Sequence, residues 1–169
     1  LLVYVPGETR WSSDGRTAHP LVEGGRAYGP LRSPDGRRVV YRRAEPPTDL
    51  SSDPFSLWLL DLQTGREVAV DLAALPTLPF ELGGRTVDLP RWPAAIEWLP
   101  DGRSFLMNTR PDFSAVGPGG SPGDDLWQVD ADTGKPRLLL AEADPPASFT
   151  VSPDGQWLLV SRPTRIEAL

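Results

Sequence analysis

Two short motifs in the sequence have the spacing of chemically active sites. The first, Gly119-Gly120-Ser121-Pro122-Gly123, has the spelling of the Gly-x-Ser-x-Gly nucleophile elbow of hydrolases. That elbow needs a strand before it and a helix after it, whereas this glycine- and proline-rich segment predicts a loop. Pro122 also lacks the backbone N–H that an oxyanion hole would need. We therefore predict that Ser121 is not a catalytic nucleophile.

The second motif, Asp130-Ala131-Asp132-Thr133-Gly134, alternates carboxylates as calcium-binding loops do. The twelfth position of such a loop is Ala141, so the bidentate glutamate is missing and a hairpin turn is favoured. The chain has one histidine, His19, and no cysteine, which excludes a thiol nucleophile, disulfides and a multi-histidine metal site. We expect no catalytic residue, no metal and no cofactor.

The composition limits the fold and the possible partners. A chain of 169 residues suits one domain, and its 20 prolines and 16 glycines exclude a coiled coil and disfavour a helical bundle. The net charge of −6 argues against a nucleic-acid partner. Apolar runs fall short of the roughly 18 residues of a membrane-spanning helix, so we expect no membrane insertion. The composition therefore favours a fold of short strands separated by turns.

A Pro-Asp-Gly turn motif recurs along the chain, with an apolar run before and after each copy. In such a turn proline presets φ, aspartate bonds its own backbone and glycine takes the positive φ that closes a short hairpin. Each copy therefore predicts a tight turn between two strands. The aspartate and glycine pairs of the copies are Asp35 and Gly36, Asp101 and Gly102, and Asp154 and Gly155.

A second turn motif lies between the copies of the first. Leu57–Gly65 and Leu126–Gly134, 69 residues apart, share the pattern Leu-Trp-x-x-Asp-x-x-Thr-Gly, and a strand-like run follows each. The turn residues are Asp61 and Gly65 in one copy and Asp130 and Gly134 in the other. The repeating unit is therefore strand a, Pro-Asp-Gly turn, strand b, long loop, strand c, Asp-x-x-Thr-Gly turn and strand d. Two tight hairpins per unit predict a four-stranded antiparallel meander.

These repeats resemble those of the TolB-like, Pro-Asp-Gly β-propeller family, which is related to the WD-type propellers. The resemblance implies an all-β fold in which each meander is one blade of a radial stack, in an extracytoplasmic or cell-envelope setting. It divides the chain into a partial blade at 1–25, with strand b at residues 1–5 followed by a c–d hairpin, blades at 26–72 and 94–141, and a partial blade with strands a and b at 147–169. Arg32 departs from the pattern, because tryptophan often precedes this turn in the family.

About three blades cannot close a ring, and an open stack leaves apolar faces and strand edges exposed at its ends. We expect the rest of a longer propeller chain to cover them. One alternative is a homodimer in which the C-terminal strands complete the partner's N-terminal blade. Another is a small self-closed variant.

The long connections, residues 44–56, 73–94 and 111–124, should all lie on the face opposite the tight turns. Loops on a rigid scaffold commonly carry binding residues, and aromatic and arginine side chains suit a protein contact. The alternative is that the aromatic residues pack onto the blades. The candidate binding residues are Phe55, Arg85, Arg91, Trp92, Arg110 and Phe113.

We therefore expect a non-enzymatic propeller segment that serves as a protein-interaction or scaffold module. The alternative implied by the resemblance is the gating propeller of a prolyl-oligopeptidase- or dipeptidyl-peptidase-like serine hydrolase, whose catalytic domain would lie outside these residues. A glycan-binding propeller is a third reading of the exposed aromatic residues.

Overall fold

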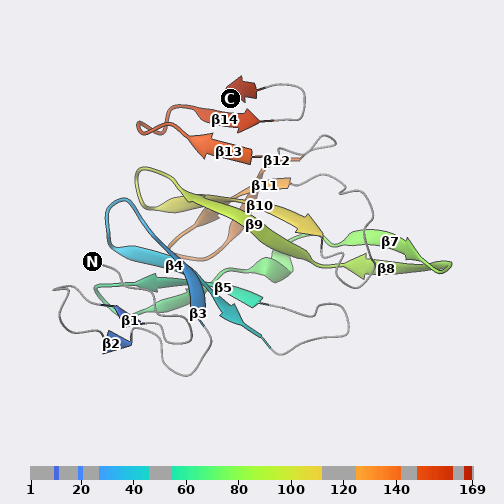
Figure 1. The fold of residues 1–169 in the computed structure, drawn as a ribbon, viewed down its shortest axis with the longest axis horizontal. Coiled ribbons are helices and arrows are strands. Elements are labelled where there is room, and N and C mark those ends of the chain that lie inside the picture. Colours follow the sequence, from blue (N-terminus) through green and yellow to red (C-terminus); the bar gives the residue numbers. More distant parts are fainter. Residues whose placement is uncertain are drawn as a thin grey trace.

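Antiparallel β-sheets stacked face to face make up the fold (Figure 1). The computed structural model describes residues 10–11, 19–20, 27–45, 55–111, 125–141, 148–161 and 166–168. The all-β fold class with four-stranded antiparallel blades of a β-propeller is confirmed, because two successive sheets have the predicted meander order.

The first complete blade pairs its strands in chain order, and each strand is antiparallel to the next. The turn between its first two strands holds Asp35 and Gly36, and the turn between its last two holds Asp61 and Gly65. The strands are β3 (Ala27–Arg32), β4 (Arg38–Ala44), β5 (Phe55–Asp61) and β6 (Glu67–Ala69).

The second blade repeats this order. Trp58 faces Tyr41 across the first blade, and Trp127 faces Met107 at the same place in the second. This register makes strands b and c of the two blades equivalent residue by residue. The strands are β9 (Arg91–Trp98), β10 (Ser104–Pro111), β11 (Asp125–Asp130) and β12 (Pro136–Leu140).

The third sheet contains a strand that the sequence did not predict. We expected strands a and b alone after residue 147, but β15 (Ile166–Ala168) pairs with β14 (Leu158–Ser161), which pairs with β13 (Ser148–Val151). β15 occupies the place of strand c, because Ala168 faces Leu159 as Leu59 faces Val40 in the first blade.

The expected long loop at 73–94 is wrong, because most of it is a β-hairpin. β7 (Leu78–Leu82) and β8 (Arg85–Leu89) form a two-stranded ribbon that points away from the Pro-Asp-Gly turns (Figure 1). Gly83 and Gly84 connect them, with φ of 58° and 78°, as a type I′ turn requires. A 3₁₀ helix, η1 (Leu72–Ala74), precedes the hairpin, so strand d ends at Ala69 rather than at residue 72, the predicted end of the blade, and β9 begins before residue 94.

At the N-terminus β1 (Arg10–Trp11) pairs antiparallel with β2 (His19–Pro20), where we expected a c–d hairpin. The strand expected at residues 1–5 lies outside the described residues.

The main core lies between the two complete blades. Successive residues of a strand point to opposite faces, so Val40 faces the second blade while Val39 and Tyr41 lie in a separate cluster on the other face. Both faces are buried, which explains why these strands are almost continuously apolar. The inter-blade core consists of Val40, Leu57, Leu59, Val70, Leu75, Trp98, Phe105, Met107, Trp127, Val129 and Ala131.

Polar contacts fix how the blades meet. Trp98 stands at the position equivalent to Arg32, and its indole N–H donates to the Leu31 carbonyl of the first blade at 3.0 Å. The Asp71 N–H donates to the Gly134 carbonyl at 3.0 Å. On the other side of the second blade, Glu97 accepts hydrogen bonds from the Thr150 hydroxyl and the Val151 N–H, each at 2.9 Å. The third sheet is thereby held to the second.

Two equivalent glycines have different surroundings. Gly65 and Gly134 end the same motif with φ of 71° and 70°. A Cβ at Gly134 would lie 2.3 Å from the Ala69 carbonyl oxygen, whereas a Cβ at Gly65 would meet nothing within 4 Å. Gly65 is therefore needed only for the backbone conformation of its turn, whereas Gly134 also allows the two blades to approach each other.

We expect Gly65→Ala to lower the free energy of unfolding by about 1–2 kcal/mol, the cost of a left-handed alanine. Gly134→Ala should cost about 1–3 kcal/mol more, because the methyl group forces the blades apart. Urea denaturation of the two variants measures the difference. Equal losses would contradict the inter-blade role of Gly134.

Candidate functional site

Two of the predicted binding residues, Phe55 and Trp92, lie in contact although they belong to different blades. Phe55 begins β5 and Trp92 is the second residue of β9, and their ring centroids are 5.3 Å apart. Both side chains are half-buried. They lie at the ends of strands rather than in loops, which corrects the expected placement.

The sequence did not single out two further members of this cluster. Tyr28 meets Phe55 edge to face at 6.4 Å, and the Arg42 guanidinium lies 5.1 Å from the centre of the Phe55 ring. Arg42 also donates to the Ala94 carbonyl at 3.5 Å. We call Tyr28, Arg42, Phe55 and Trp92 the aromatic cluster. Tyr28 and Arg42 are cross-strand neighbours, so the first hairpin of the blade brings them together.

The remaining predicted binding residues do not join this cluster. Arg91 pairs with Asp125 at 3.2 Å, and both side chains are largely buried, so this pair ties β9 to β11 within the second blade. Arg85 is exposed on β8. Arg110 lies in β10 opposite Trp92 on β9. Phe113 and Ser121 lie outside the described residues.

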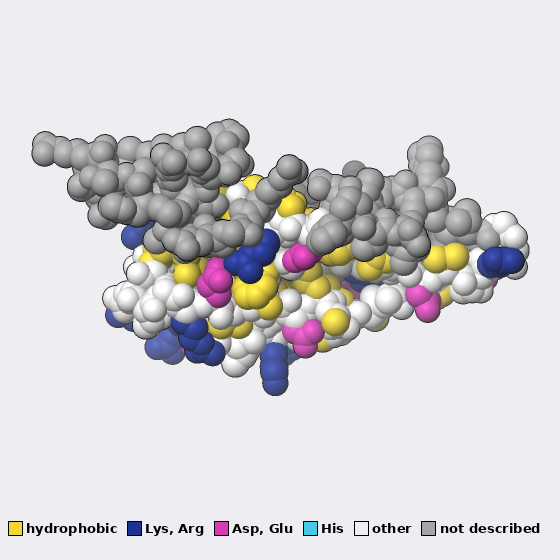
Figure 2. Space-filling model, turned by 90° about the horizontal axis from the view of Figure 1, so that it is seen from below, with side chains coloured by type: hydrophobic (Ala, Val, Ile, Leu, Met, Phe, Trp, Pro, Cys, Tyr) yellow, Lys and Arg dark blue, Asp and Glu magenta, His cyan; other side chains and the backbone are white. Residues whose placement is uncertain are grey.

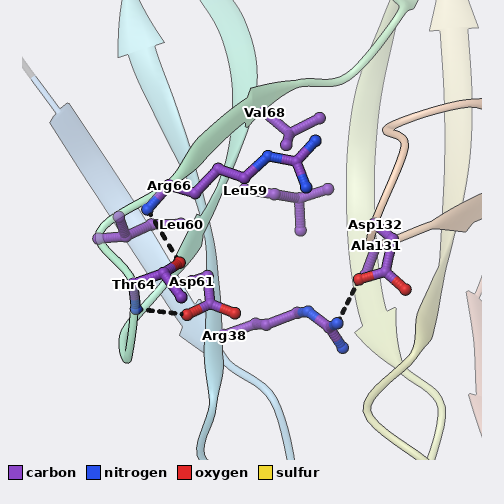
Figure 3. A pocket seen from close by; sticks show the side chains of 9 residues that line it. All are labelled: Arg38, Leu59, Leu60, Asp61, Thr64, Arg66, Val68, Ala131 and Asp132. Carbon is purple, nitrogen blue, oxygen red and sulfur yellow. Dashed lines mark hydrogen bonds and ion pairs between the residues drawn. The ribbon is translucent and has the colours of Figure 1, made fainter.

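A small pocket lies where the c–d end of the first blade meets the c–d turn of the second (Figure 3). We call it the inter-blade pocket; its volume is about 150 Å³. Arg38 crosses it, donating to the Gly102 carbonyl at 2.9 Å and forming an ion pair with Asp132. The lining residues are Arg38, Leu59, Leu60, Asp61, Thr64, Arg66, Val68, Ala131 and Asp132.

The turn aspartates act as backbone acceptors. Asp61 Oδ1 accepts the N–H groups of Gln63 and Thr64 at 2.9 and 2.8 Å, and Asp130 Oδ1 accepts those of Asp132 and Thr133 together with the Thr133 hydroxyl. The hydrogen bond from the Thr133 hydroxyl is the largest cause of the lowered pKa of Asp130. Burial opposes this shift, and the backbone N–H groups of Thr133 and Asp132 lower the pKa further. For Asp61 the largest cause of the lowered pKa is the Thr64 N–H.

The aspartates of the Pro-Asp-Gly turns also accept hydrogen bonds from residues of their own turns. The Ser33 hydroxyl donates to Asp35 at 2.6 Å, and the Ser152 hydroxyl donates to Asp154 at 2.5 Å. These hydroxyls are the largest causes that lower the pKa of Asp35 and of Asp154. The carboxylates therefore have a structural task in the turns.

A polar network lies on the face of the first blade opposite the second blade. The Arg43 guanidinium stacks over the Trp58 ring at 4.2 Å and donates to the Tyr41 hydroxyl and to Glu67 at 2.8 and 2.9 Å. Tyr41 donates to Glu67, and burial, followed by this hydrogen bond, raises the pKa of the phenol. Because Trp58 also donates to the Ser56 hydroxyl at 2.7 Å, its indole is engaged in packing and hydrogen bonding.

Acidic and basic side chains are interspersed with hydrophobic ones on the face drawn in Figure 2. Among the described residues no three His, Cys, Asp or Glu side chains are grouped to hold a metal ion. In the same part of the chain no helix is long and apolar enough to span a bilayer.

Solved structures share this fold. A putative dipeptidyl aminopeptidase IV from Bacteroides ovatus is similar with a TM-score of 0.54 and 14% identity, covering 91% of this chain and 26% of that one. The GH74 xyloglucanase from Xanthomonas campestris gives 0.54 and 17%, covering 91% and 22%. TolB from Acinetobacter baumannii gives 0.32 and 15%, covering 96% and 46%, a score too low to support an argument.

These likenesses show the fold alone, since a peptidase and a xyloglucanase match to the same degree. The chain spans about a quarter of the length of those two proteins. No known family matches the sequence, and no curated protein matches it either.

The lowered pKa of Asp130 gives the unfolding free energy a pH dependence. A carboxyl group whose pKa is lower in the folded state stabilises it above the unfolded pKa, and this contribution disappears as the pH falls below 3.8. We expect the unfolding free energy of Asp130→Asn to fall less steeply between about pH 5 and about pH 2 than that of the unchanged chain, as measured by urea denaturation. Asp88→Asn, at an exposed position on β8, is the control and should leave the slope unchanged.

Arg38 should contribute more to stability than its ion-pair partner. Asp132 is 65% exposed, so Asp132→Asn should cost less than about 1 kcal/mol. Arg38→Met should cost about 1.5–3 kcal/mol, because it also removes the charged donor of the Gly102 carbonyl. A double-mutant cycle by urea denaturation separates the two contributions. Equal losses in the two single variants would show that the ion pair alone matters.

Proposed function

We propose that this propeller segment is a protein-interaction module and that the aromatic cluster is its contact surface. The observation that carries the proposal is the joining of Phe55 and Trp92 across two blades at the ends of their strands. Tyrosine, tryptophan and arginine side chains dominate the binding energy of protein interfaces, and the cluster contains all three types.

The setting of the cluster supports this role. Arg42 is held by the Phe55 ring and the Ala94 carbonyl, so its donors are preorganised before a partner arrives. Both neighbouring sheets have buried cores, which keeps the strand ends rigid. Side chains fixed in this way lose little entropy on binding.

A gating propeller of a serine hydrolase is the alternative function. It requires an α/β-hydrolase domain outside these residues, and the presence of such a domain in the parent reading frame would favour it. The similarity to a peptidase does not decide between the two, because the xyloglucanase is equally similar. The proposal for this segment is the same interaction surface in either setting.

Selection from a displayed library against the immobilised chain tests the proposal. We expect the recovered protein ligands to lose at least about tenfold in affinity with Trp92→Ala, because interface tryptophans are frequent hot spots. Leu138→Ala, at an exposed leucine on β12, is the matched control and should bind normally. Thermal melting confirms that both variants fold. Ligands that bind Trp92→Ala and Phe55→Ala with unchanged affinity would contradict the proposal.

A further inference from the structure

Strand β4 directs an arginine toward the second blade at each of its ends. Arg38, Val40 and Arg42 alternate along the strand, so their side chains lie on one face of the sheet, and Val40 belongs to the inter-blade core. Arg38 donates to the Gly102 carbonyl and Arg42 to the Ala94 carbonyl, both in the second blade. The two arginines therefore occupy comparable places at opposite ends of one interface.

The two arginines differ in how fully their guanidinium groups are satisfied. Arg38 bonds its carbonyl at 2.9 Å and also forms an ion pair with Asp132. The Arg42 bond is 3.5 Å long, beyond the roughly 2.7–3.2 Å typical of an N–H···O hydrogen bond. Within the described part of the chain Arg42 forms no ion pair, and its buried Nε has no hydrogen-bond partner. Arg42 therefore keeps a charge and donors that its own protein does not satisfy.

The lack of a carboxylate partner is not shared by the neighbouring arginines at this end of the blades. Arg43, the next residue of β4, pairs with Glu67 at 2.9 Å, and Arg91 at the start of β9 pairs with Asp125 at 3.2 Å. Each of these pairs lies within one blade. The charge that remains for a partner is that of Arg42.

The backbone of β3 makes room for the Arg42 guanidinium beside the aromatic rings. The register of β3 on β4 shifts between Tyr28 and Leu31, and Gly29 within this bulge has a φ of 61°. A Cβ at Gly29 would lie 3.3 Å from Arg42 Nη1, so a side chain there would crowd the guanidinium. Bulges commonly redirect side chains near binding sites. Here the bulge lets the cation lie 5.1 Å from the centre of the Phe55 ring.

We propose that the aromatic cluster recognises an aspartate or glutamate side chain of a partner protein. The carboxylate pairs with Arg42, and an apolar side chain next to it in the partner packs on Trp92. A guanidinium donates two parallel N–H groups to a carboxylate, which makes this pair stronger and more directional than a neutral hydrogen bond. The contact of Asp132 with Arg38 is the precedent within the chain.

The charge of the chain favours a single carboxylate over a polyanion. The net charge is −6, and one unpaired arginine among aromatic rings offers no extended cationic surface to a nucleic acid. An acidic residue with an apolar neighbour matches both parts of the cluster. The inference rests on the proposed function and names the chemistry of the partner at the same site.

Peptides selected from a displayed random library against the immobilised chain are the probes, restricted to those that Trp92→Ala weakens. Each is remade with its aspartates changed to asparagine or its glutamates to glutamine. We expect one such change to reduce affinity at least about tenfold in fluorescence anisotropy, and added salt to weaken the acidic form more than the amide form. Arg42→Gln should weaken the acidic peptide by a similar factor and remove the difference between the two forms.

Arg37→Gln is the matched control, because Arg37 is an exposed arginine immediately before β4 at its other end. This variant should bind both peptide forms as the unchanged chain does. Thermal melting confirms that the variants fold. The comparison of acidic and amide peptides uses the unchanged chain, so it decides the inference even where Arg42→Gln is unstable.

Trp92-dependent peptides that bind equally in acidic and amide forms would overturn this inference and leave the proposed function standing. An acid preference that persists in Arg42→Gln would also overturn it, because a different cation would then be the partner. Peptides that bind Trp92→Ala and Phe55→Ala with unchanged affinity would instead contradict the proposed function. The two failures are therefore distinguished by which variant changes the binding.

Discussion

The burial of both faces of each sheet against its neighbours is the constraint on which the fold depends. A four-stranded meander with apolar residues on two sides cannot bury them alone, so every blade needs another on each face. Val39 and Val40, adjacent in β4, belong to different core clusters for this reason. The distance between neighbouring blades is then set by features such as Gly134, which lies against Ala69, and the inter-blade hydrogen bond of Trp98.

The constraint explains why polar residues of the motifs are structural. The turn aspartates hold backbone N–H groups, and their lowered pKa values result from those hydrogen bonds. Such shifts often mark reactive groups, but here every donor belongs to the turn itself. The groups that we propose for recognition lie where two blades meet, at the ends of strands.

The blades were predictable from the sequence because their turns are determined locally. Pro-Asp-Gly and Asp-x-x-Thr-Gly need only neighbouring residues to form, and repetition made them visible. The β7–β8 hairpin occurs once, so no repeat revealed it. β15 was missed because Glu167 stands where Trp58 and Trp127 stand in the complete blades. The contact of Phe55 with Trp92 depends on how two blades pack, which no local pattern encodes.

The ion pair between Arg38 and Asp132 gives the stack a polarity. The cation belongs to the first blade and the anion to the c–d turn of the second, so the two faces that meet here are chemically unlike. Two copies of the Arg38 face would repel each other, whereas the Arg38 face attracts the turn that carries Asp132. The packing of the second blade on the first therefore has a direction along the stack.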